Sequence, residues 1–279
     1  MLSSNIDILY GNLVKGLSRF FLNQGKEKAV LGLSGGLDSA VVAAIATEAL
    51  GKENVYGLLM PSPFSTLHSV TDAVELASNL GIKHSIVPIE AIYNRYMKEL
   101  ETLFYGEVRG ITSENLQARI RGNILMAFSN NGGALLLNTS NKSELAMGYG
   151  TLYGDLCGAI MVIGDIYKLQ AYGIAHYVNS KREIIPESTI TKEPSAELRD
   201  NQKDSDSLPK YSILDPILHA LLEEDINPEE LIEKGTERLL VDRIVKLTKN
   251  SLFKVHQVPP VLQVGDHPLL PENKCIKSF

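Results

Sequence analysis

Short aliphatic runs alternate with longer amphipathic or alanine-rich segments in the first half of the chain. Four runs have the length of strands covered on both faces: residues 29–33, 54–61, 83–89 and 134–138. Segments typical of helices lie between these runs. They cover residues 39–50, 66–81, a stretch ending near 105, and 112–133, the last of which directly precedes the fourth run. This alternation predicts an α/β fold, a doubly wound parallel sheet with additional helices, whose ligands bind at the carboxyl ends of the strands.

The second half is expected to add helices at residues 166–179, 212–224 and 227–235. In the last of these, Asn227 can cap and Pro228 occupies the first helical position. Residues 187–209 are polar and lack periodicity, which by composition favours a disordered connector slightly over a mobile lid. Residues 251–279 are interrupted by prolines and are expected to form an extended arm of a single domain spanning 1–279.

Composition narrows the class of protein. With 279 residues, 44% of them hydrophobic, the chain can bury a full core, and its net charge of −6 is spread without a basic cluster. A nucleic-acid surface is therefore not expected. The apolar runs are shorter than the roughly 18 residues of a membrane span, and residues 1–16 lack a signal-peptide pattern, so we expect a cytoplasmic protein with no membrane partner. Two cysteines, Cys157 and Cys275, cannot build a disulfide framework.

The junction between residues 29–33 and 39–50 carries the sequence Ser-Gly-Gly-Leu-Asp-Ser. Gly35 and Gly36 remove the Cβ atoms that would keep a ligand from the backbone, and the N–H groups that open the next helix lack intrahelical partners. Such a turn binds anions. Its glycine spacing matches neither the P-loop nor the dinucleotide fingerprint. The alternative is an ordinary glycine turn capped by Asp38 and Ser39.

The Ser-Gly-Gly-x-Asp-Ser sequence resembles the motif of the N-type ATP pyrophosphatases. Together with "LLNTSNKSELAMGYGTLYGD" (136–155), "GDIYKLQ" (164–170) and "KEPSAEL" (192–198), it resembles the NAD synthetase family, of the ammonia-dependent type, over residues 29–260. The resemblance implies that nicotinic acid adenine dinucleotide is amidated to NAD through an adenylated intermediate. ATP would be the co-substrate, Mg²⁺ the cofactor and ammonia the nitrogen donor, with AMP and pyrophosphate released. It also implies a homodimer.

The same resemblance assigns roles to individual residues. The catalytic group would be Asp38, Glu144 and Lys168, with Asp38 and Glu144 as magnesium ligands. The ATP contacts would be Gly32, Leu33, Ser34, Gly35, Gly36, Leu37, Asp38, Ser39, Thr139, Lys168 and Ser195. The contacts to the dinucleotide would be Arg119, Tyr149, Asp155, Lys254 and His256.

Each assignment has a plainer alternative. Glu144 could cap the helix that Asn141 begins, Lys168 could be a solvated cation, and Arg119 could belong to the polar face of its helix. Leu152 and Ala159 stand where many ammonia-using members have a lysine and an aspartate, so the nicotinate side of the site departs from that pattern.

The Ser-Gly-Gly-x-Asp-Ser motif is also compatible with other functions. Another ATP pyrophosphatase-type amidotransferase or synthetase, or a non-catalytic adenine-nucleotide subunit of the same fold, would share the first motif. An adenylated intermediate must be kept from water, which gives residues 187–209 a reason to act as a lid.

Overall fold

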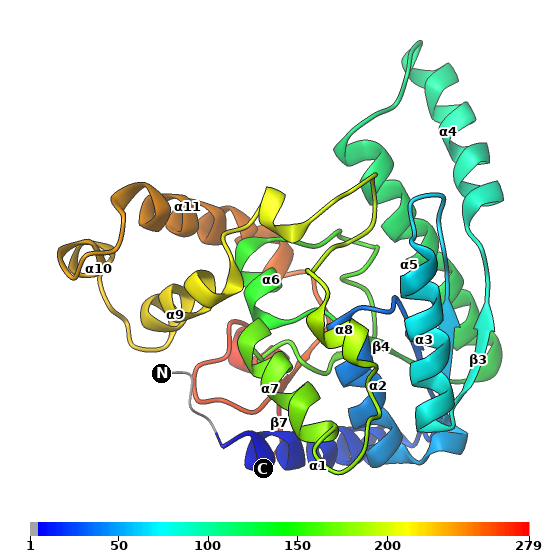
Figure 1. Ribbon diagram of the computed structural model, residues 1–279, viewed down its shortest axis with the longest axis horizontal. Coiled ribbons are helices and arrows are strands. Elements are labelled where there is room, and N and C mark those ends of the chain that lie inside the picture. Colours follow the sequence, from blue (N-terminus) through cyan, green and yellow to red (C-terminus); the bar gives the residue numbers. More distant parts are fainter. Residues whose placement is uncertain (1–4, 279) are drawn as a thin grey trace.

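The computed structural model describes residues 5–278; residues 1–4 and 279, at the ends of the expected 1–279 domain, lie outside the described part. A seven-stranded sheet forms its centre (Figure 1), in the order β3-β2-β1-β4-β5-β6-β7, and every neighbouring pair is parallel. The strands are β1 (Ala29–Gly32), β2 (Val55–Leu59), β3 (Lys83–Ile86), β4 (Leu135–Asn138), β5 (Ile160–Met161), β6 (Val261–Gln263) and β7 (Cys275–Lys277). The order reverses between β1 and β4, so the predicted doubly wound α/β fold is confirmed.

Helices precede, connect and extend the sheet. They are α1 (Ile6–Gln24), α2 (Leu37–Leu50), α3 (Leu67–Leu80), α4 (Glu90–Phe104), α5 (Ile111–Gly132), α6 (Lys142–Met147), α7 (Lys168–Val178), α8 (Glu187–Thr191), α9 (Tyr211–Leu222), α10 (Pro228–Glu233) and α11 (Arg238–Val255), with short 3-10 turns η1 (Lys52–Asn54), η2 (Asp204–Asp206) and η3 (Glu272–Lys274). The predicted start of α10 is confirmed, because the Asn227 side chain accepts a hydrogen bond from Glu229 N and Pro228 is the first helical residue.

Both faces of the sheet are covered. In β1, Leu31 packs into a core shared with α1, α2 and α7, while Val30 packs on the opposite face with residues of α4 and α5. Leu137 and Leu136 of β4 divide between the two faces in the same way. This is why these strands are continuous aliphatic runs, without the polar positions of a half-exposed sheet.

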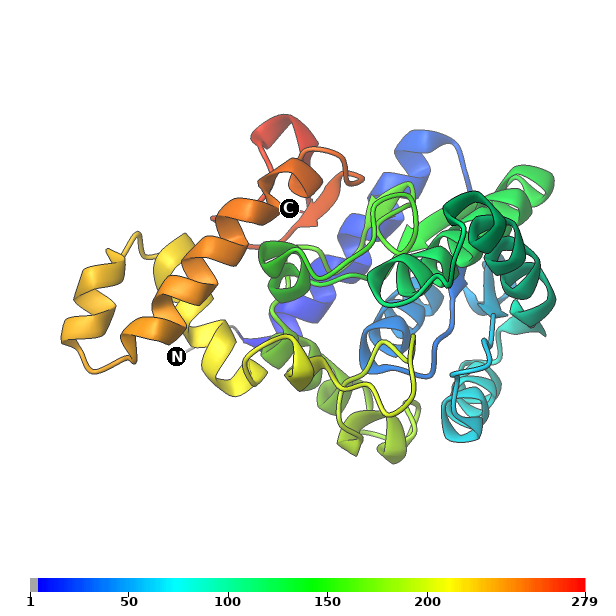
Figure 2. The same ribbon diagram turned by 90° about the horizontal axis from the view of Figure 1, so that it is seen from above.

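A helical extension stands beside the sheet. Helices α6, α9, α10 and α11 share an apolar cluster of their own, and Figure 2 shows α10 and part of α11 projecting away from the sheet. Because α6 belongs to this cluster and also follows β4 directly, the extension fixes the position of the chain just beyond the carboxyl end of β4.

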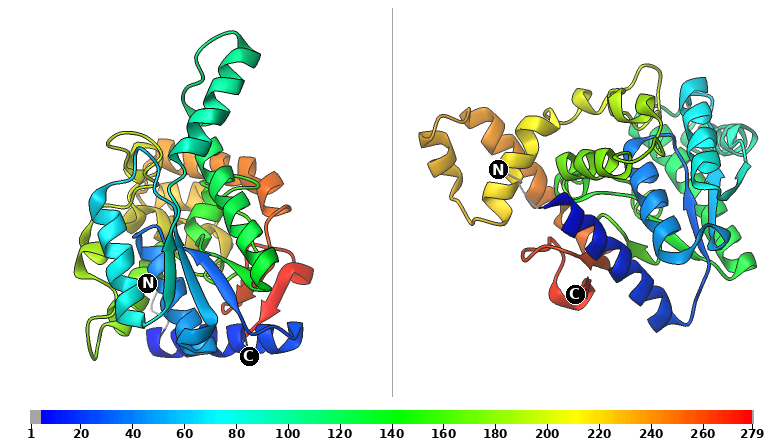
Figure 3. Two further views of the ribbon diagram at one scale, coloured as in Figure 1. Left: turned by 90° about the vertical axis from the view of Figure 1, so that its right-hand side faces the viewer. Right: turned by 60° about the horizontal axis from the view of Figure 1, so that its bottom comes forward.

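The expectation of an extended arm at residues 251–279 is wrong in part. Helix α11 continues to Val255, and β6 and β7 then extend the sheet along one edge. Each of these strands has only three residues, which is too short for a periodicity that would predict a strand. Helix α1 was also not predicted; it packs against α2 and α7, next to the C-terminal strands (Figure 3, right).

Residues 187–209 are folded here rather than a structureless connector. They contain α8 and η2 and make hydrogen bonds to α3 and α5. Among residues 5–278, no helix has the length and apolar character that a membrane crossing requires.

Candidate active site

The turn after β1 adopts a conformation that needs glycine. Gly35 has φ +77°, and a Cβ at this position would lie 2.1 Å from the carbonyl oxygen of Ser69. Ser34 Oγ accepts a hydrogen bond from Gly36 N at 3.1 Å, and Ser39 Oγ donates to Gly36 O at 2.9 Å. The turn therefore closes on itself and leads into the first turn of α2, whose N–H groups lack intrahelical partners.

A cavity of about 300 Å³ lies where the sheet order reverses, at the carboxyl ends of β1, β2 and β4. Most of the residues predicted from the sequence line it: Gly32, Leu33, Ser34, Gly36, Leu37, Asp38, Ser39, Thr139, Glu144, Tyr149, Asp155, Lys168 and Ser195. Gly35 is outside this lining and acts through the shape of the turn. Segments separated by more than a hundred residues thus meet at one cavity.

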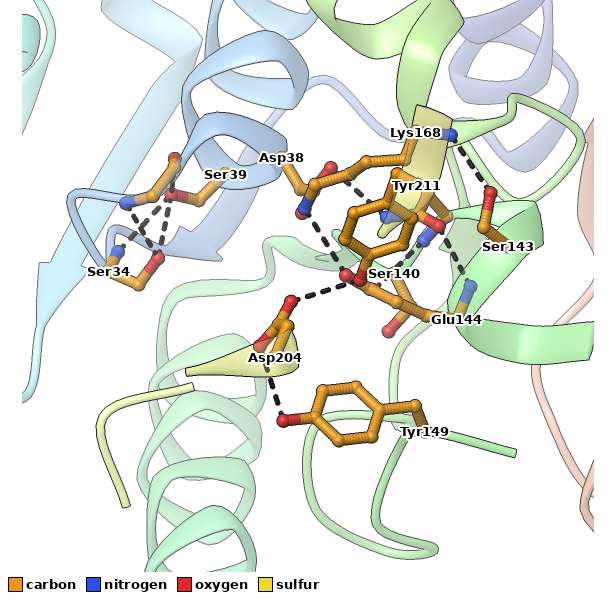
Figure 4. Close-up of polar contacts among 12 residues, drawn as sticks. Ser34, Asp38, Ser39, Ser140, Ser143, Glu144, Tyr149, Lys168, Asp204 and Tyr211 are labelled. Atoms are coloured by element: carbon orange, nitrogen blue, oxygen red, sulfur yellow. Dashed lines mark hydrogen bonds and ion pairs between the residues drawn. The ribbon is translucent and has the colours of Figure 1, made fainter. Parts of the chain in front are cut away.

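Lys168 is the centre of the polar group in this cavity (Figure 4). Its ammonium forms ion pairs with Asp38 Oδ2 and, at 3.4 Å, with Glu144 Oε1. Asn141 Nδ2 donates to the other oxygen of Asp38 at 3.2 Å. Since the lysine side chain is only 4% exposed, the alternative of a solvated helical cation is wrong.

Burial and neighbouring charges shift the pKa values of Glu144 and Lys168. Burial raises the pKa of Glu144 to about 8, and the charge of Asp38 adds to the rise while Lys168 opposes it. Burial by itself would lower the pKa of Lys168, but Asp38 and Glu144 outweigh it and the pKa is raised. The ammonium therefore stays charged across the physiological pH range and holds a fixed positive charge at the cavity.

Glu144 has two structural contacts at once. Its backbone N–H donates to Asn141 Oδ1 at 2.9 Å, and Glu144 Oε2 accepts from Asn141 N at 3.4 Å, which forms a capping box at the start of α6. Glu144 therefore does cap the helix that Asn141 begins, as the alternative predicted. The cap accounts for one carboxylate oxygen, while the other faces Lys168 in the cavity.

Asp215 of α9 holds the start of α7, the helix on which Lys168 lies, and is not itself part of the cavity lining. It is fully buried and accepts hydrogen bonds from Ser143 Oγ at 2.7 Å and from Leu169 N at 2.8 Å. Burial raises the pKa of Asp215 to about 6, with the two hydrogen bonds opposing the rise. This carboxyl thus links α9 to the starts of α6 and α7.

Three of the predicted dinucleotide contacts lie away from the cavity. Arg119 is exposed on α5, and its Nε donates to the carbonyl of Leu152 at 3.2 Å. Lys254 donates to two backbone carbonyls of the turn at residues 148–150, and His256 is exposed at the end of α11. None of the three belongs to the cavity lining.

Arg121, two residues beyond Arg119, lines the cavity instead. Its Nε donates to the carbonyl of Met60 at 3.0 Å, and burial lowers its pKa to about 10. On a helix the two arginines point about 200° apart, so only one can face the sheet. The burial of Ile120 and Gly122 beside Arg121 shows which side is covered, a distinction that the short arginine motif does not contain.

The two positions that depart from the ammonia-using pattern are packing positions. Leu152 packs against the apolar cluster between α6 and the C-terminal strands, and Ala159 packs against the main core. Neither is part of the cavity lining, so these substitutions leave the polar group around Lys168 unchanged.

Segment 187–209 forms one wall of the cavity. Its lining residues are Thr189, Lys192, Glu193, Pro194, Ser195, Ala196, Glu197, Leu198 and Asp204. Ser195 Oγ donates to Gln202 O at 2.6 Å, which stabilises the loop itself. Asp204 accepts hydrogen bonds from Tyr149 and Tyr211 at 3.2 and 3.0 Å. No sequence motif indicated Asp204, because its role depends on partners that only the fold brings to it.

In the part of the chain that the structure describes, no group of three or more His, Cys, Asp or Glu side chains is arranged to hold a metal ion. Asp38 and Glu144 are two carboxylates, and each has lone pairs beyond those used by Lys168 and Asn141. Mg²⁺ is commonly bound by one or two carboxylates together with substrate phosphates. The donor set therefore fits a magnesium ion that arrives with a nucleotide.

Comparison with known proteins agrees with this site. The NAD synthase family model matches residues 9–258. The glutamine-dependent NAD(+) synthetase of Synechocystis sp. is 50% identical over 258 residues, covering 92% of this chain and 46% of that protein. A glutamine-dependent NAD+ synthetase from Acinetobacter baumannii, solved with adenosine diphosphate, has a TM-score of 0.67 and 37% identity, covering 95% of this chain and 48% of that one.

A solved NH3-dependent NAD synthetase from Campylobacter jejuni has a TM-score of 0.74 and 31% identity, and the match covers 94% of this chain and all of that one. This chain spans about half the length of the glutamine-dependent relatives that it matches. The fold, the cavity at the strand-order reversal and the family match agree, and the chain belongs to the NAD synthase family.

Proposed function

We propose that this chain catalyses the ATP-dependent amidation of nicotinic acid adenine dinucleotide to NAD, with release of AMP and pyrophosphate. The observation that carries the proposal is the meeting of the Ser-Gly-Gly turn, Asp38, Glu144 and Lys168 at one cavity. The family match supports the choice of substrate. The relative solved with adenosine diphosphate supports an adenine nucleotide as the co-substrate.

A carboxylate does not accept an amine at neutral pH, because the oxygen that must leave is too poor a leaving group. Attack of the nicotinate carboxylate on the α-phosphorus of ATP would form an acyl adenylate and expel pyrophosphate. The first-turn N–H groups of α2 and the hydroxyls of Ser34 and Ser39 would bind the phosphates. Lys168, held charged by its two carboxylates, would stabilise the negative charge that develops on the leaving pyrophosphate.

Asp38 and Glu144 would hold the magnesium ion that accompanies ATP, since their carboxylates face the same cavity. Bound there, the ion would neutralise charge on the phosphates. In its absence Asp38 and Glu144 both contact Lys168, whose positive charge compensates the negative charge that they carry in a buried site.

The nucleophile at this site is ammonia in our proposal. A relative described as NH3-dependent matches 94% of this chain at 31% identity, while the more similar curated relatives are glutamine-dependent. Hydrolysis of glutamine needs an activated thiolate or similar nucleophile. Burial, with the charge of Asp155, raises the pKa of Cys157 to about 11, and burial also raises the pKa of Cys275. Both thiols are therefore protonated at neutral pH and unsuited to that task.

We also propose that two copies associate through α4 and the start of α5, which stand clear of the rest of the molecule (Figure 3, left). Leu103, Phe104, Tyr105 and Ile111 there are between 59% and 97% exposed. Large apolar side chains that are exposed together on one part of the surface are typical of an interaction site. Sedimentation of the protein as a dimer, lost when Leu103 and Tyr105 are both changed to Asp, would support this; an unchanged dimer would refute the assigned face.

The function is tested by product analysis with different nitrogen donors. The chain should convert nicotinic acid adenine dinucleotide to NAD with ammonium, releasing one AMP per amide, and should fail with glutamine. Formation of NAD from glutamine by this chain alone, lost when Cys157 or Cys275 is changed to Ser, would contradict ammonia as the donor. Absence of NAD with either donor from the folded protein would contradict the function itself.

A further inference from the structure

The carboxylate of Glu197 is bound to the first turn of α3. Glu197 Oε1 accepts from Ser69 Oγ at 2.6 Å and from Thr66 Oγ1 at 3.0 Å, and Oε2 accepts from Thr66 N at 3.2 Å. Thr66 is the N-cap of this helix, where the helix dipole also favours a negative charge. The carboxylate of this one side chain in segment 187–209 thus accepts three hydrogen bonds from the start of a helix that is 128 residues or more away in sequence.

The backbone of Glu197 is in the left-handed region, with φ +49°. Residues with a Cβ rarely adopt this conformation, and it persists where the surroundings determine it. The side chain is the part of Glu197 with the most contacts, so its bonds to α3 are the clearest reason for the backbone geometry. The loop is therefore shaped to bring this carboxylate to the helix.

The turn of α3 that receives Glu197 also contacts the phosphate-binding turn. The carbonyl oxygen of Ser69 lies 2.1 Å from the position that a Cβ of Gly35 would take, and Ser69 is itself part of the cavity lining. From the other side, Thr189 Oγ1 donates to Gly35 O at 3.4 Å. Glu197 is thus connected to the Ser-Gly-Gly turn through one intervening residue.

Contacts on both sides of Glu197 span the cavity. Lys192 Nζ lies 3.1 Å from both Asp72 Oδ2 and Ser69 Oγ on α3. Beyond Glu197, the carbonyl of Leu198 accepts from Gln117 Nε2 of α5 at 2.8 Å. The segment therefore runs from α3 to α5 as part of the cavity wall, with Glu197 between its two attachments.

We propose that Glu197 is a positioning residue that fixes segment 187–209 over the cavity and so keeps water from the acyl adenylate. This rests on the proposed function. Attack of ammonia on the acyl carbon forms the C–N bond, breaks the bond to the AMP oxygen and yields amide, AMP and a proton. Attack of water at the same carbon returns the carboxylic acid and AMP, so ATP is consumed without amide.

The test is the ratio of AMP to NAD released by Glu197→Ala at saturating ATP, dinucleotide and ammonium. Losing a charge-assisted hydrogen bond shifts an equilibrium by about tenfold or more. We therefore expect about one AMP per NAD in the wild type and roughly tenfold more in Glu197→Ala. The matched control is Asp200→Asn, which removes a negative charge three residues away. Asp200 is exposed, and its side chain makes no hydrogen bond or ion pair with a described residue.

A ratio in folded Glu197→Ala equal to that of the wild type, or a rise of the same size in Asp200→Asn, would overturn the proposal. If Glu197→Ala does not fold, Glu197→Gln replaces it, because the amide keeps the size and one acceptor and should give an intermediate ratio. Protease cleavage within 187–209 in the presence of an ATP analogue is the second measurement, and faster cleavage of Glu197→Ala than of Asp200→Asn is expected.

The two readouts separate the possible failures. If the wild type makes no NAD, the proposed function fails, while cleavage rates still test the attachment of the segment. If the wild type makes NAD and Glu197→Ala keeps its coupling, the function stands and the role of Glu197 is refuted.

Discussion

Replacing Gly35 by Ala should damage the phosphate-binding turn far more than replacing Gly36. A Cβ at position 35 would lie 2.1 Å from the carbonyl oxygen of Ser69, and real Cβ atoms keep at least 3.0 Å from such neighbours. The turn or the start of α3 must therefore move by roughly 1 Å, and both are packed backbone. The positive φ adds about 1–2 kcal/mol for any residue with a Cβ.

Together these effects predict a loss of about 3 kcal/mol or more in the free energy of unfolding for Gly35→Ala. Gly36→Ala is the stability control. Gly36 has φ −89°, and the nearest atom to its added Cβ is the hydroxyl oxygen of Ser34 at 3.2 Å, which can rotate away. This change should cost within about 1 kcal/mol.

Urea unfolding measures both variants, and calorimetric titration with ATP measures nucleotide affinity of Gly35→Ala under folded conditions. We expect weaker ATP binding as well, because the displaced turn no longer presents its N–H groups to the phosphates. Equal stabilities of the two alanine variants, with ATP affinity of Gly35→Ala unchanged, would refute the account of this turn.

Other predictions concern the charged group and its support. Asp38→Asn and Glu144→Gln should each lower adenylation by about a hundredfold or more, and the double variant should lose much less than the product, because both carboxylates contact the same ammonium of Lys168; full additivity would indicate separate roles. For Asp215, the folded pKa of about 6 lies above the unfolded value of about 3.9, so the folded protein binds more protons between these pH values. Stability should therefore fall as pH rises from about 4 to 6, by up to about 3 kcal/mol relative to Asp215→Asn, and parallel pH curves of unfolding free energy would contradict this. Cys157→Ser should keep its ammonium-dependent activity, measured as NAD formed per minute, and a loss of more than tenfold without unfolding would show that the thiol has a role.

Local patterns were enough to predict the centre of the fold. β1 and β4 are mostly aliphatic because they are buried on both faces of the sheet, and the turn after β1 carries its glycines within six residues. The alternation with helices then predicts the reversal of strand order and the position of the cavity. Asp38, Glu144 and Lys168 were assigned by the resemblance to a known family, because each lies in one of the short motifs that carry it.

What depends on tertiary packing could not be predicted. The three-residue strands β6 and β7 acquire their conformation from the sheet edge that they join. Arg121 and Asp204 reach the cavity because of which helix face is buried and how segment 187–209 is attached. The contacts predicted for Arg119, Lys254 and His256 lie outside the cavity of a single copy, so they remain predictions for an assembly with a second one.

The adenylated intermediate is the centre of the proposed mechanism, and isotope transfer tests it most directly. Nicotinic acid adenine dinucleotide labelled with ¹⁸O in both oxygens of the nicotinate carboxylate would be converted with ATP and ammonium, and the products analysed by mass spectrometry. If the carboxylate attacks the α-phosphorus, one ¹⁸O must appear in the phosphate of AMP, one must stay in the amide of NAD, and pyrophosphate must be unlabelled. Label in pyrophosphate or inorganic phosphate, or AMP without label, would contradict the mechanism.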